Sequence, residues 1–213
     1  INLEKMLSKK DRVVAELTKG IQFLFKKNNV MRFHGEAVIK SASEIEVTSV
    51  DGKATQLQTE KIIIAVGSEP ICLPNLAFDE KKIVSSTGAL NLDRVPKRLV
   101  VIGGGYIGLE MGSVWSRLGS KVTVVEFLNK IVPNVDVEIG KQFQKNLEKQ
   151  GIAFMLETKV VEVSVKDKKL EIIAEQINGE DRETIECDVV LIAAGRKPCT
   201  DSLGLDKVGV KRG

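Results

Sequence analysis

Apolar residues near the start of the chain recur at spacings close to three, four and seven. This period places apolar side chains along one face of a helix. We therefore predict an amphipathic helix over residues 2–28, with Gly20 as a weak point and Asn28-Asn29 at its end. The recurring apolar positions are Leu3, Met6, Val13, Val14, Leu17, Ile21 and Leu24.

Shorter apolar runs follow this helix and are typical of strands. They cover residues 30–33, 37–39 and 44–50, with a further apolar position at Leu57. Asp51-Gly52 stands between the last two, and this dipeptide is a strong hairpin signal. The pattern predicts a small antiparallel β-meander.

Two longer runs, at 62–66 and 189–193, are continuously apolar. Such runs are typical of strands that are buried on both faces of a sheet. Similar small-residue turns follow them, at 67–70 and 195–198. Two similar strands on either side of a central segment predict one domain inserted into another, with a loop-rich connection over residues 71–96.

The central residues 99–126 combine a strand, a glycine-rich turn, a helix-period segment and a second strand. The turn has the spacing Gly103-x-Gly105-x-x-Gly108. In this spacing the first glycine permits the tight turn, the second lets a pyrophosphate approach the backbone, and the third lets helix and strand pack closely. The phosphates would lie against free N–H groups at the start of the helix. The segment predicts a dinucleotide site on a Rossmann-like βαβ unit.

Glu126 ends the second strand of this unit, 18 residues after Gly108 (126 − 108 = 18), near the expected distance of about 20. A carboxylate here accepts hydrogen bonds from both ribose hydroxyls of an adenosine. A 2′-phosphate would bring a like charge close to it, and Lys130 is the only nearby cation. NAD is therefore favoured over NADP. The alternative is that Glu126 is a solvated residue at a strand end.

Beyond Glu126 the pattern predicts a second helix over 135–150 and strands around 154–156 and 160–165. A hairpin-like pair brackets Asn178-Gly179 before the last strand. Both ends of the chain lie within patterned segments. We therefore expect these 213 residues to be the middle of a longer protein.

The composition adds limits to this picture. The net charge is only +3 and the basic residues are dispersed, so nothing indicates a nucleic-acid or membrane partner. No apolar run approaches the length of a membrane span, and no secretory signal opens the chain. Cys72, Cys187 and Cys199 have no spacing typical of a disulfide framework or a metal site. We expect a reducing compartment and no metal.

Four stretches, at 62–70, 83–90, 98–128 and 195–205, resemble the FAD-dependent pyridine nucleotide-disulfide oxidoreductases, and among them the members that oxidise dihydrolipoyl groups. The resemblance covers the whole chain but only the middle of such an enzyme. It implies an α/β fold with a Rossmann-like NAD-binding domain and an incomplete FAD-binding domain that contains a small antiparallel β-meander. The implied boundaries are a partial FAD-binding domain at 1–95, the NAD-binding domain at 96–197, and a return segment to the FAD-binding domain at 198–213.

The resemblance also implies site residues. Glu126 falls on the adenine ribose, Val160 beside the adenine, and Gly195 at the second small-residue turn. From their places after the glycine-rich turn, we expect Glu110 to orient the nicotinamide carboxamide and Tyr106 to cover its pocket. The alternatives are that Glu110 is a helix N-terminal acid stabilised by the helix dipole and that Tyr106 is a structural tyrosine. The implied NAD contacts are Gly103, Gly104, Gly105, Tyr106, Ile107, Gly108, Leu109, Glu110, Glu126, Val160 and Gly195. The implied FAD contacts, made largely through the backbone, are Ala37, Val66, Gly67 and Ser68. Many relatives have glycine at the place of Ala37 and threonine at that of Val66.

The activity implied is FAD-mediated oxidation of dihydrolipoyl groups with hydride transfer to NAD⁺ in 2-oxo-acid dehydrogenase complexes. The implied partners are the dihydrolipoyl domains of those complexes and a second copy of the full-length protein. The implied location is the bacterial cytoplasm or the mitochondrial matrix. The family's redox-active CxxxxC pair and its catalytic base are absent from these residues, so this chain is expected to hold no catalytic residue, to be inactive alone and to keep few FAD contacts. The alternatives are another NAD(P)-linked flavin disulfide reductase and a non-catalytic NAD-binding module.

Overall fold

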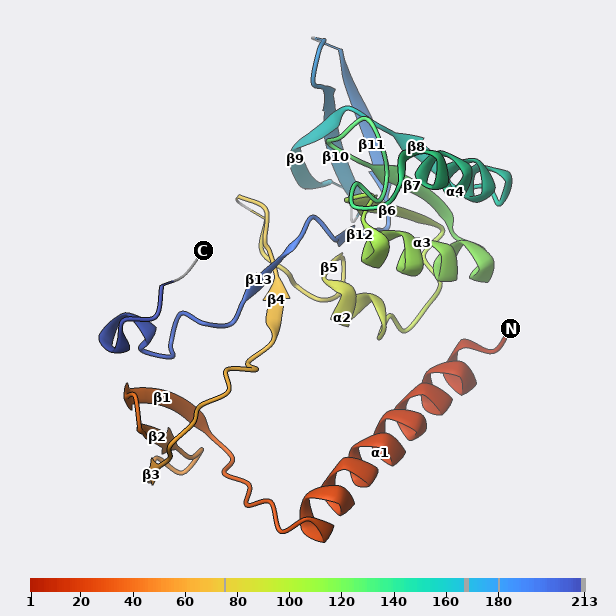
Figure 1. Cartoon of the computed structure of the whole chain (residues 1–213). Coiled ribbons are helices and arrows are strands. Elements are labelled where there is room, and N and C mark those ends of the chain that lie inside the picture. Colours follow the sequence, from red (N-terminus) through yellow and green to blue (C-terminus); the bar gives the residue numbers. More distant parts are fainter. Residues whose placement is uncertain (75, 167–168, 180, 212–213) are drawn as a thin grey trace. The chain divides into compact units, whose positions relative to one another are not determined.

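The computed structural model describes residues 1–74, 76–166, 169–179 and 181–211 (Figure 1). The chain divides into two compact units. The sheet unit consists of residues 1–7 and 70–196, and the meander unit consists of residues 8–69 and 197–213.

A five-stranded parallel sheet forms the centre of the sheet unit. Its strands lie in the order β5-β12-β6-β7-β8. Every neighbouring pair is parallel, so the carboxyl ends of all five strands lie along one edge. The strands are β5 (Ile83–Val84), β6 (Arg98–Ile102), β7 (Lys121–Val125), β8 (Ala153–Met155) and β12 (Val189–Ile192).

Helices pack against one face of this sheet. They are α2 (Ser86–Ala89), α3 (Tyr106–Leu118) and α4 (Val137–Lys149). Leu109 and Trp115 of α3 join Leu99 and Val124 in one buried cluster. The predicted helix after the glycine-rich turn and the helix predicted over 135–150 are therefore confirmed.

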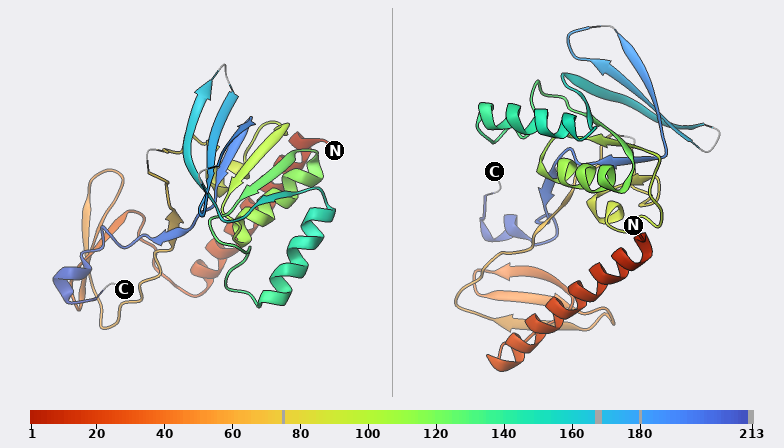
Figure 2. Two further views of the ribbon diagram at one scale, coloured as in Figure 1. Left: turned by 90° about the horizontal axis from the view of Figure 1, so that it is seen from above. Right: turned by 90° about the vertical axis from the view of Figure 1, so that its right-hand side faces the viewer.

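An antiparallel sheet covers the other face. Its strands β9 (Thr158–Lys166), β10 (Lys169–Gln176) and β11 (Arg182–Cys187) are drawn in cyan to blue in Figure 2. Leu170 and Ile172 of β10 pack with Val190 of the parallel sheet. Cys187 is fully buried there, and this burial raises the pKa of its thiol to about 12. Cys187 is therefore a small buried residue of this core.

The meander unit contains three antiparallel strands in the order β1-β2-β3. They are β1 (Glu36–Ser41), β2 (Glu44–Thr48) and β3 (Ala54–Gln58), and the predicted turn at Asp51-Gly52 joins the last two. The 3₁₀ helix η1 (Leu205–Val208) packs on β1, where Ile39 donates its N–H to the carbonyl of Leu203 at 2.9 Å. The predicted α/β fold class with a small meander is therefore confirmed.

The helix predicted over residues 2–28 is present as α1 (Leu3–Lys27). No residue of α1 is buried, and Leu17 and Phe23 are 66% and 64% exposed. No helix among the described residues is long and apolar enough to cross a bilayer.

Two predicted strands are wrong. Residues 30–33 and 61–67 form no strand. A strand begins only after the second run, where β4 (Ser68–Pro70) pairs with β13 (Arg196–Pro198), and Ile63 within the run is 90% exposed. A doubly buried strand needs a neighbour on each side and a cover on each face, and no described strand pairs with 61–67.

The connection over residues 71–96 belongs to the sheet unit rather than standing apart from it. It carries β5, which pairs with β12, and α2, which packs beside α3. The indole N–H of Trp115 donates to the carbonyl of Ala89 at 3.1 Å and fixes α2 to α3. The main segment of the sheet unit therefore runs from residue 70 to residue 196.

Candidate functional site

The turn between β6 and α3 is built around Gly103. Its φ is +108°, a value that residues with a side chain rarely adopt. A Cβ there would also lie 2.5 Å from the carbonyl oxygen of Ala193, the residue that directly follows the neighbouring β12. The prediction that a glycine is needed for this turn is confirmed, and β12 adds a second reason.

Gly105 differs from Gly103 because its backbone angles, φ −75° and ψ 173°, suit any residue. No atom lies within 4 Å of the position that its Cβ would occupy. Gly105 is also the N-cap of α3, and no side chain caps the first N–H groups of this helix. The first backbone N–H groups of α3 therefore have no side-chain cap and lie next to open space. Helix starts of this kind bind anionic groups.

Gly108 and Leu109 lie behind this turn and do not line the open space. A Cβ on Gly108 would lie 2.3 Å from the carbonyl oxygen of Gly103, so the close packing predicted for this glycine is confirmed. The side chain of Leu109 is 1% exposed in the core. These two residues position α3.

A cleft of about 430 Å³ opens at the carboxyl edge of the parallel sheet, in front of the turn. The predicted residues on its wall are Gly103, Gly105, Tyr106, Ile107, Glu126 and Gly195. The side chain of Tyr106 is 67% exposed. Glu110 is exposed and lies one turn into α3, and its carboxylate makes no hydrogen bond or ion pair with another described residue.

Glu126 lies at the end of β7 and is only 8% exposed. One carboxylate oxygen accepts the N–H of Gly104, and the other accepts the N–H of Leu128 at 2.7 Å. The N–H of Gly104 is therefore engaged within the protein. An ionised carboxylate has about four acceptor positions, so Glu126 keeps acceptor capacity toward the cleft that it lines.

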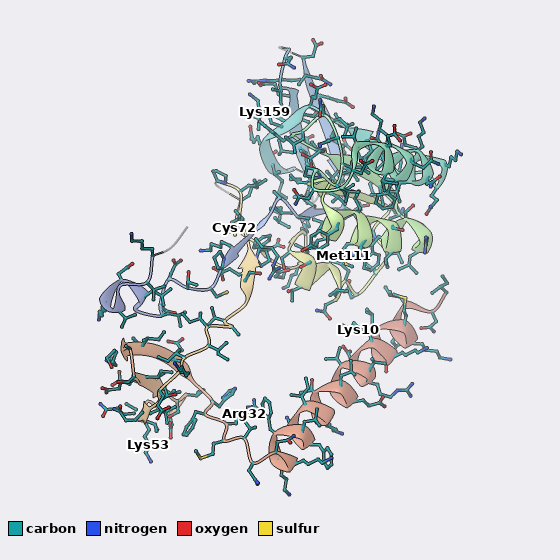
Figure 3. The ribbon with its side chains drawn as sticks, in the orientation of Figure 1. Lys10, Arg32, Lys53, Cys72, Met111 and Lys159 are labelled. Atoms are coloured by element: carbon teal, nitrogen blue, oxygen red, sulfur yellow. The ribbon has the colours of Figure 1, made fainter. Side chains whose placement is uncertain are left out.

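A second hollow of about 210 Å³ adjoins the cleft and shares Gly103, Glu126 and Ala194 with it. Val160 and Lys159, at the start of β9, line this hollow. Lys159, which is labelled in Figure 3, is the positively charged residue on the wall of this hollow. Glu126 thus stands where two adjoining spaces meet.

Lys159 is held by an acidic residue of the next strand. Its ammonium lies 2.7 Å from the carboxylate of Glu175, which also lies 3.0 Å from the guanidinium of Arg182. Hydrogen bonds from Lys159 and then Arg182 lower the pKa of Glu175 below its ordinary value. The positive charge of Lys159 is therefore matched within the antiparallel sheet.

One wall of the cleft comes from the loop after β7, which the sequence analysis did not predict. Val132 donates its N–H to the carbonyl of Gly104 at 2.9 Å, and Ile131 is 1% exposed beneath it. This brings Pro133 and Asn134 to the cleft. The sequence carries no motif for them, because their place depends on loop hydrogen bonds.

The four residues implied for FAD lie in the meander unit. Ala37 is half-buried in β1, whereas Val66 and Gly67 are exposed at the end of the run 61–67, and Ser68 is exposed at the start of β4. The carbonyl of Gly67 accepts the N–H of Cys199 at 3.0 Å. The cleft of the sheet unit includes none of these four residues.

The cleft offers amide donors at a helix start, apolar walls and one buried carboxylate. These groups suit a ligand with a pyrophosphate and a ribose, and Gly105 leaves the space that such a ligand fills. No thiol lines the cleft, and Cys187 lies in the core. The arrangement is suited to binding and orienting a dinucleotide.

Comparisons with known proteins agree with this geometry. A family model described as pyridine nucleotide-disulphide oxidoreductase matches residues 2–213. Mitochondrial dihydrolipoyl dehydrogenase of Pisum sativum is 54% identical over 99% of this chain and 42% of its own length. Leghemoglobin reductase of Vigna unguiculata is 54% identical over 99% and 40%, and dihydrolipoyl dehydrogenase 3 of Pseudomonas putida is 46% identical over 99% and 45%. The chain spans less than half the length of these relatives.

Solved structures share the fold. The HOCl-induced flavoprotein disulfide reductase RclA from Escherichia coli has a TM-score of 0.82 at 27% identity, over 98% of this chain and 46% of that protein. LpdA from Mycobacterium tuberculosis has a TM-score of 0.89 at 23% identity, over 100% of this chain and 47% of that protein.

Proposed function

Because this chain belongs to the pyridine nucleotide-disulphide oxidoreductases, we propose that it carries the NAD site of a dihydrolipoyl dehydrogenase. The observation that carries the proposal is the open space at Gly105 in front of the uncapped α3, next to the buried Glu126. Close relatives named dihydrolipoyl dehydrogenase support the choice of reaction.

In this proposal NAD lies across the carboxyl edge of the parallel sheet. The adenosine occupies the hollow between Glu126 and Val160, and the pyrophosphate lies at the turn from Gly103 to Gly105. The nicotinamide end extends toward Gly195 at the end of β12. The sheet order supports this direction, because β12 lies on the side of β6 that is opposite to β7.

FAD, when bound through the backbone near Ala37 and residues 66–68, supplies the two-electron chemistry between a disulfide and NAD. The residues of this chain bind and orient. Glu126 fixes the adenosine, Tyr106 covers the nicotinamide pocket, and Glu110 holds the carboxamide and so selects the ring face. Orientation of this kind lowers a barrier by fixing the reacting geometry in advance.

Turnover by the full-length protein that contains this chain tests the reaction. We expect dihydrolipoamide-dependent reduction of NAD⁺, together with NADH binding measured by calorimetry. Glu110→Gln is expected to slow hydride transfer in rapid-mixing experiments while NADH binding changes little. Protein that binds no NADH, or that prefers NADPH, would contradict the proposed site.

The partners and location follow from the same proposal. Dihydrolipoyl domains of 2-oxo-acid dehydrogenase complexes would deliver the electrons, and the full-length protein would act as a homodimer. The relatives include mitochondrial and bacterial proteins. We propose the mitochondrial matrix or the bacterial cytoplasm accordingly.

A second candidate is another flavin disulfide reductase with the same NAD site. It is favoured by the similarity to a leghemoglobin reductase and to the disulfide reductase RclA. NADH binding without dihydrolipoamide turnover by the full-length protein would select this candidate.

A further inference from the structure

Ser86 lines the cleft from a side that none of the predicted residues occupies. Ser86 lies two residues after the end of β5, with Ser85 between them. The two residues of β5, Ile83 and Val84, pair with β12. In a parallel sheet the residues that follow the strands meet at one edge. Ser86 therefore reaches the dinucleotide cleft from the edge strand of the sheet.

The backbone around Ser86 is held by the neighbouring residue. The hydroxyl of Ser85 donates to the carboxylate of Glu80 at 2.7 Å, and the backbone N–H of Ser85 donates to the same carboxylate at 3.1 Å. The Ser85 hydroxyl oxygen also accepts the N–H of Thr87 at 3.1 Å. Trp115 fixes the end of α2 through the carbonyl of Ala89. The place of Ser86 is therefore set before any ligand arrives.

The hydroxyls of Ser85 and Ser86 differ in their hydrogen bonding within the protein. Ser85 is 3% exposed, and its hydroxyl makes all its contacts within the protein. Ser86 is half-buried on the cleft wall, and its hydroxyl has no hydrogen-bond partner among the described residues. A hydroxyl on a residue that lines a binding space, with no partner in the protein, is available to a ligand.

The strand order shows which part of the ligand it meets. Along the edge the order is Glu126 after β7, Gly103 after β6, Gly195 after β12, and Ser86 after β5. Ser86 and Glu126 are three strand spacings apart, which is roughly 14 Å. With the adenosine at Glu126 and the pyrophosphate at Gly103, Ser86 lies on the nicotinamide side.

We propose that Ser86 is a binding residue for the nicotinamide-ribose half of the dinucleotide, through a hydrogen bond of its hydroxyl. This inference rests on the proposed function, because it requires NAD in the cleft. It adds a contact from β5 to those that the glycine-rich turn and Glu126 supply.

Calorimetric titration of the full-length protein with NADH and with ADP tests the inference. ADP contains the adenosine and the pyrophosphate but lacks the nicotinamide ribose. Ser86→Ala is expected to weaken NADH binding roughly three- to tenfold, the effect of one neutral hydrogen bond, and to leave ADP binding unchanged. Ser86→Thr keeps the hydroxyl and is expected to keep most of the NADH affinity.

Thr87→Val is the matched control, because it removes a hydroxyl from the next residue, which is exposed and does not line the cleft. If Ser86→Ala and Thr87→Val bind NADH equally, Ser86 has no role in binding. An equal loss for ADP and NADH also overturns the inference. Ser86→Cys replaces the alanine variant if that protein fails to fold. Wild-type protein that binds neither ligand refutes the proposed function itself and is thereby distinguished from a failure at Ser86.

Discussion

Replacing Gly105 with alanine separates the glycine that a ligand requires from the glycines that the fold requires. The backbone angles of Gly105 suit alanine, and its added methyl group would have no protein atom within 4 Å. The substitution therefore strains nothing in the folded protein. Alanine restricts the unfolded chain, which favours folding by about 0.4–1 kcal/mol, but it is a poorer N-cap than glycine by a similar amount. We therefore expect Gly105→Ala to change the free energy of unfolding by less than about 1 kcal/mol.

Gly105 lines the cleft in front of α3, so the same methyl group would take up open space at the cleft wall. A pyrophosphate at this place would be pushed away from the N–H groups that bind it. Each hydrogen bond to a charged group contributes about 1.5–3 kcal/mol. Loss of one such bond corresponds to a roughly 10- to 150-fold higher Kd for NADH.

The assay combines NADH titration with thermal unfolding of the full-length protein. Gly108→Ala is the contrasting variant, because its Cβ would lie 2.3 Å from the carbonyl oxygen of Gly103, and we expect it to lower the Tm. A Gly105→Ala protein that unfolds like the wild type and binds NADH with the same Kd would refute the reasoning. The pyrophosphate would then lie elsewhere.

Three further predictions concern charge and reactivity. Glu126→Ala removes a like-charge repulsion of about 4 kcal/mol at 4 Å, so titrations should show the NADPH-to-NADH affinity ratio rising at least roughly tenfold, and an unchanged ratio would contradict the role of Glu126. Cys187, whose burial raises its thiol pKa to about 12, should resist iodoacetamide at pH 8 in folded protein and react in urea, as read by mass spectrometry. The pKa of Glu175 is lowered in the folded state by Lys159 and then Arg182, so its stabilising contribution is present above its ordinary value of 4.5 and is lost as the pH falls through the lowered folded value. The stability difference between wild type and Glu175→Gln, measured by urea unfolding, should therefore shrink in that acidic range, and a constant difference would contradict the ion pair's role.

The local features of the site could be predicted from the sequence because they depend on short spacings. The turn at Gly103, the packing of Gly108 and the position of Glu126 all follow from one strand–turn–helix–strand segment. The helix over residues 2–28 and the hairpin at Asp51-Gly52 follow from periodicity and turn chemistry in the same way.

Features that depend on distant partners could not be predicted. Residues 61–67 have the apolar pattern of a doubly buried strand, but burial requires neighbours that the pattern does not supply. Ser86 and Asn134 reach the cleft through the pairing of β5 with β12 and through the hydrogen bond from Val132 to Gly104. Neither arrangement leaves a motif in the sequence.

The exposed run 61–67 has a consequence for how these 213 residues behave when they are produced by themselves. Ile63 is 90% exposed, and the β-branched residues around it have high strand propensity. An open, apolar backbone edge of this kind is a template for pairing between molecules, which leads to aggregation. A charged residue substituted into this run should therefore make the 213-residue chain more soluble, and the run is distant in sequence from Gly103 and Glu126 of the NAD cleft.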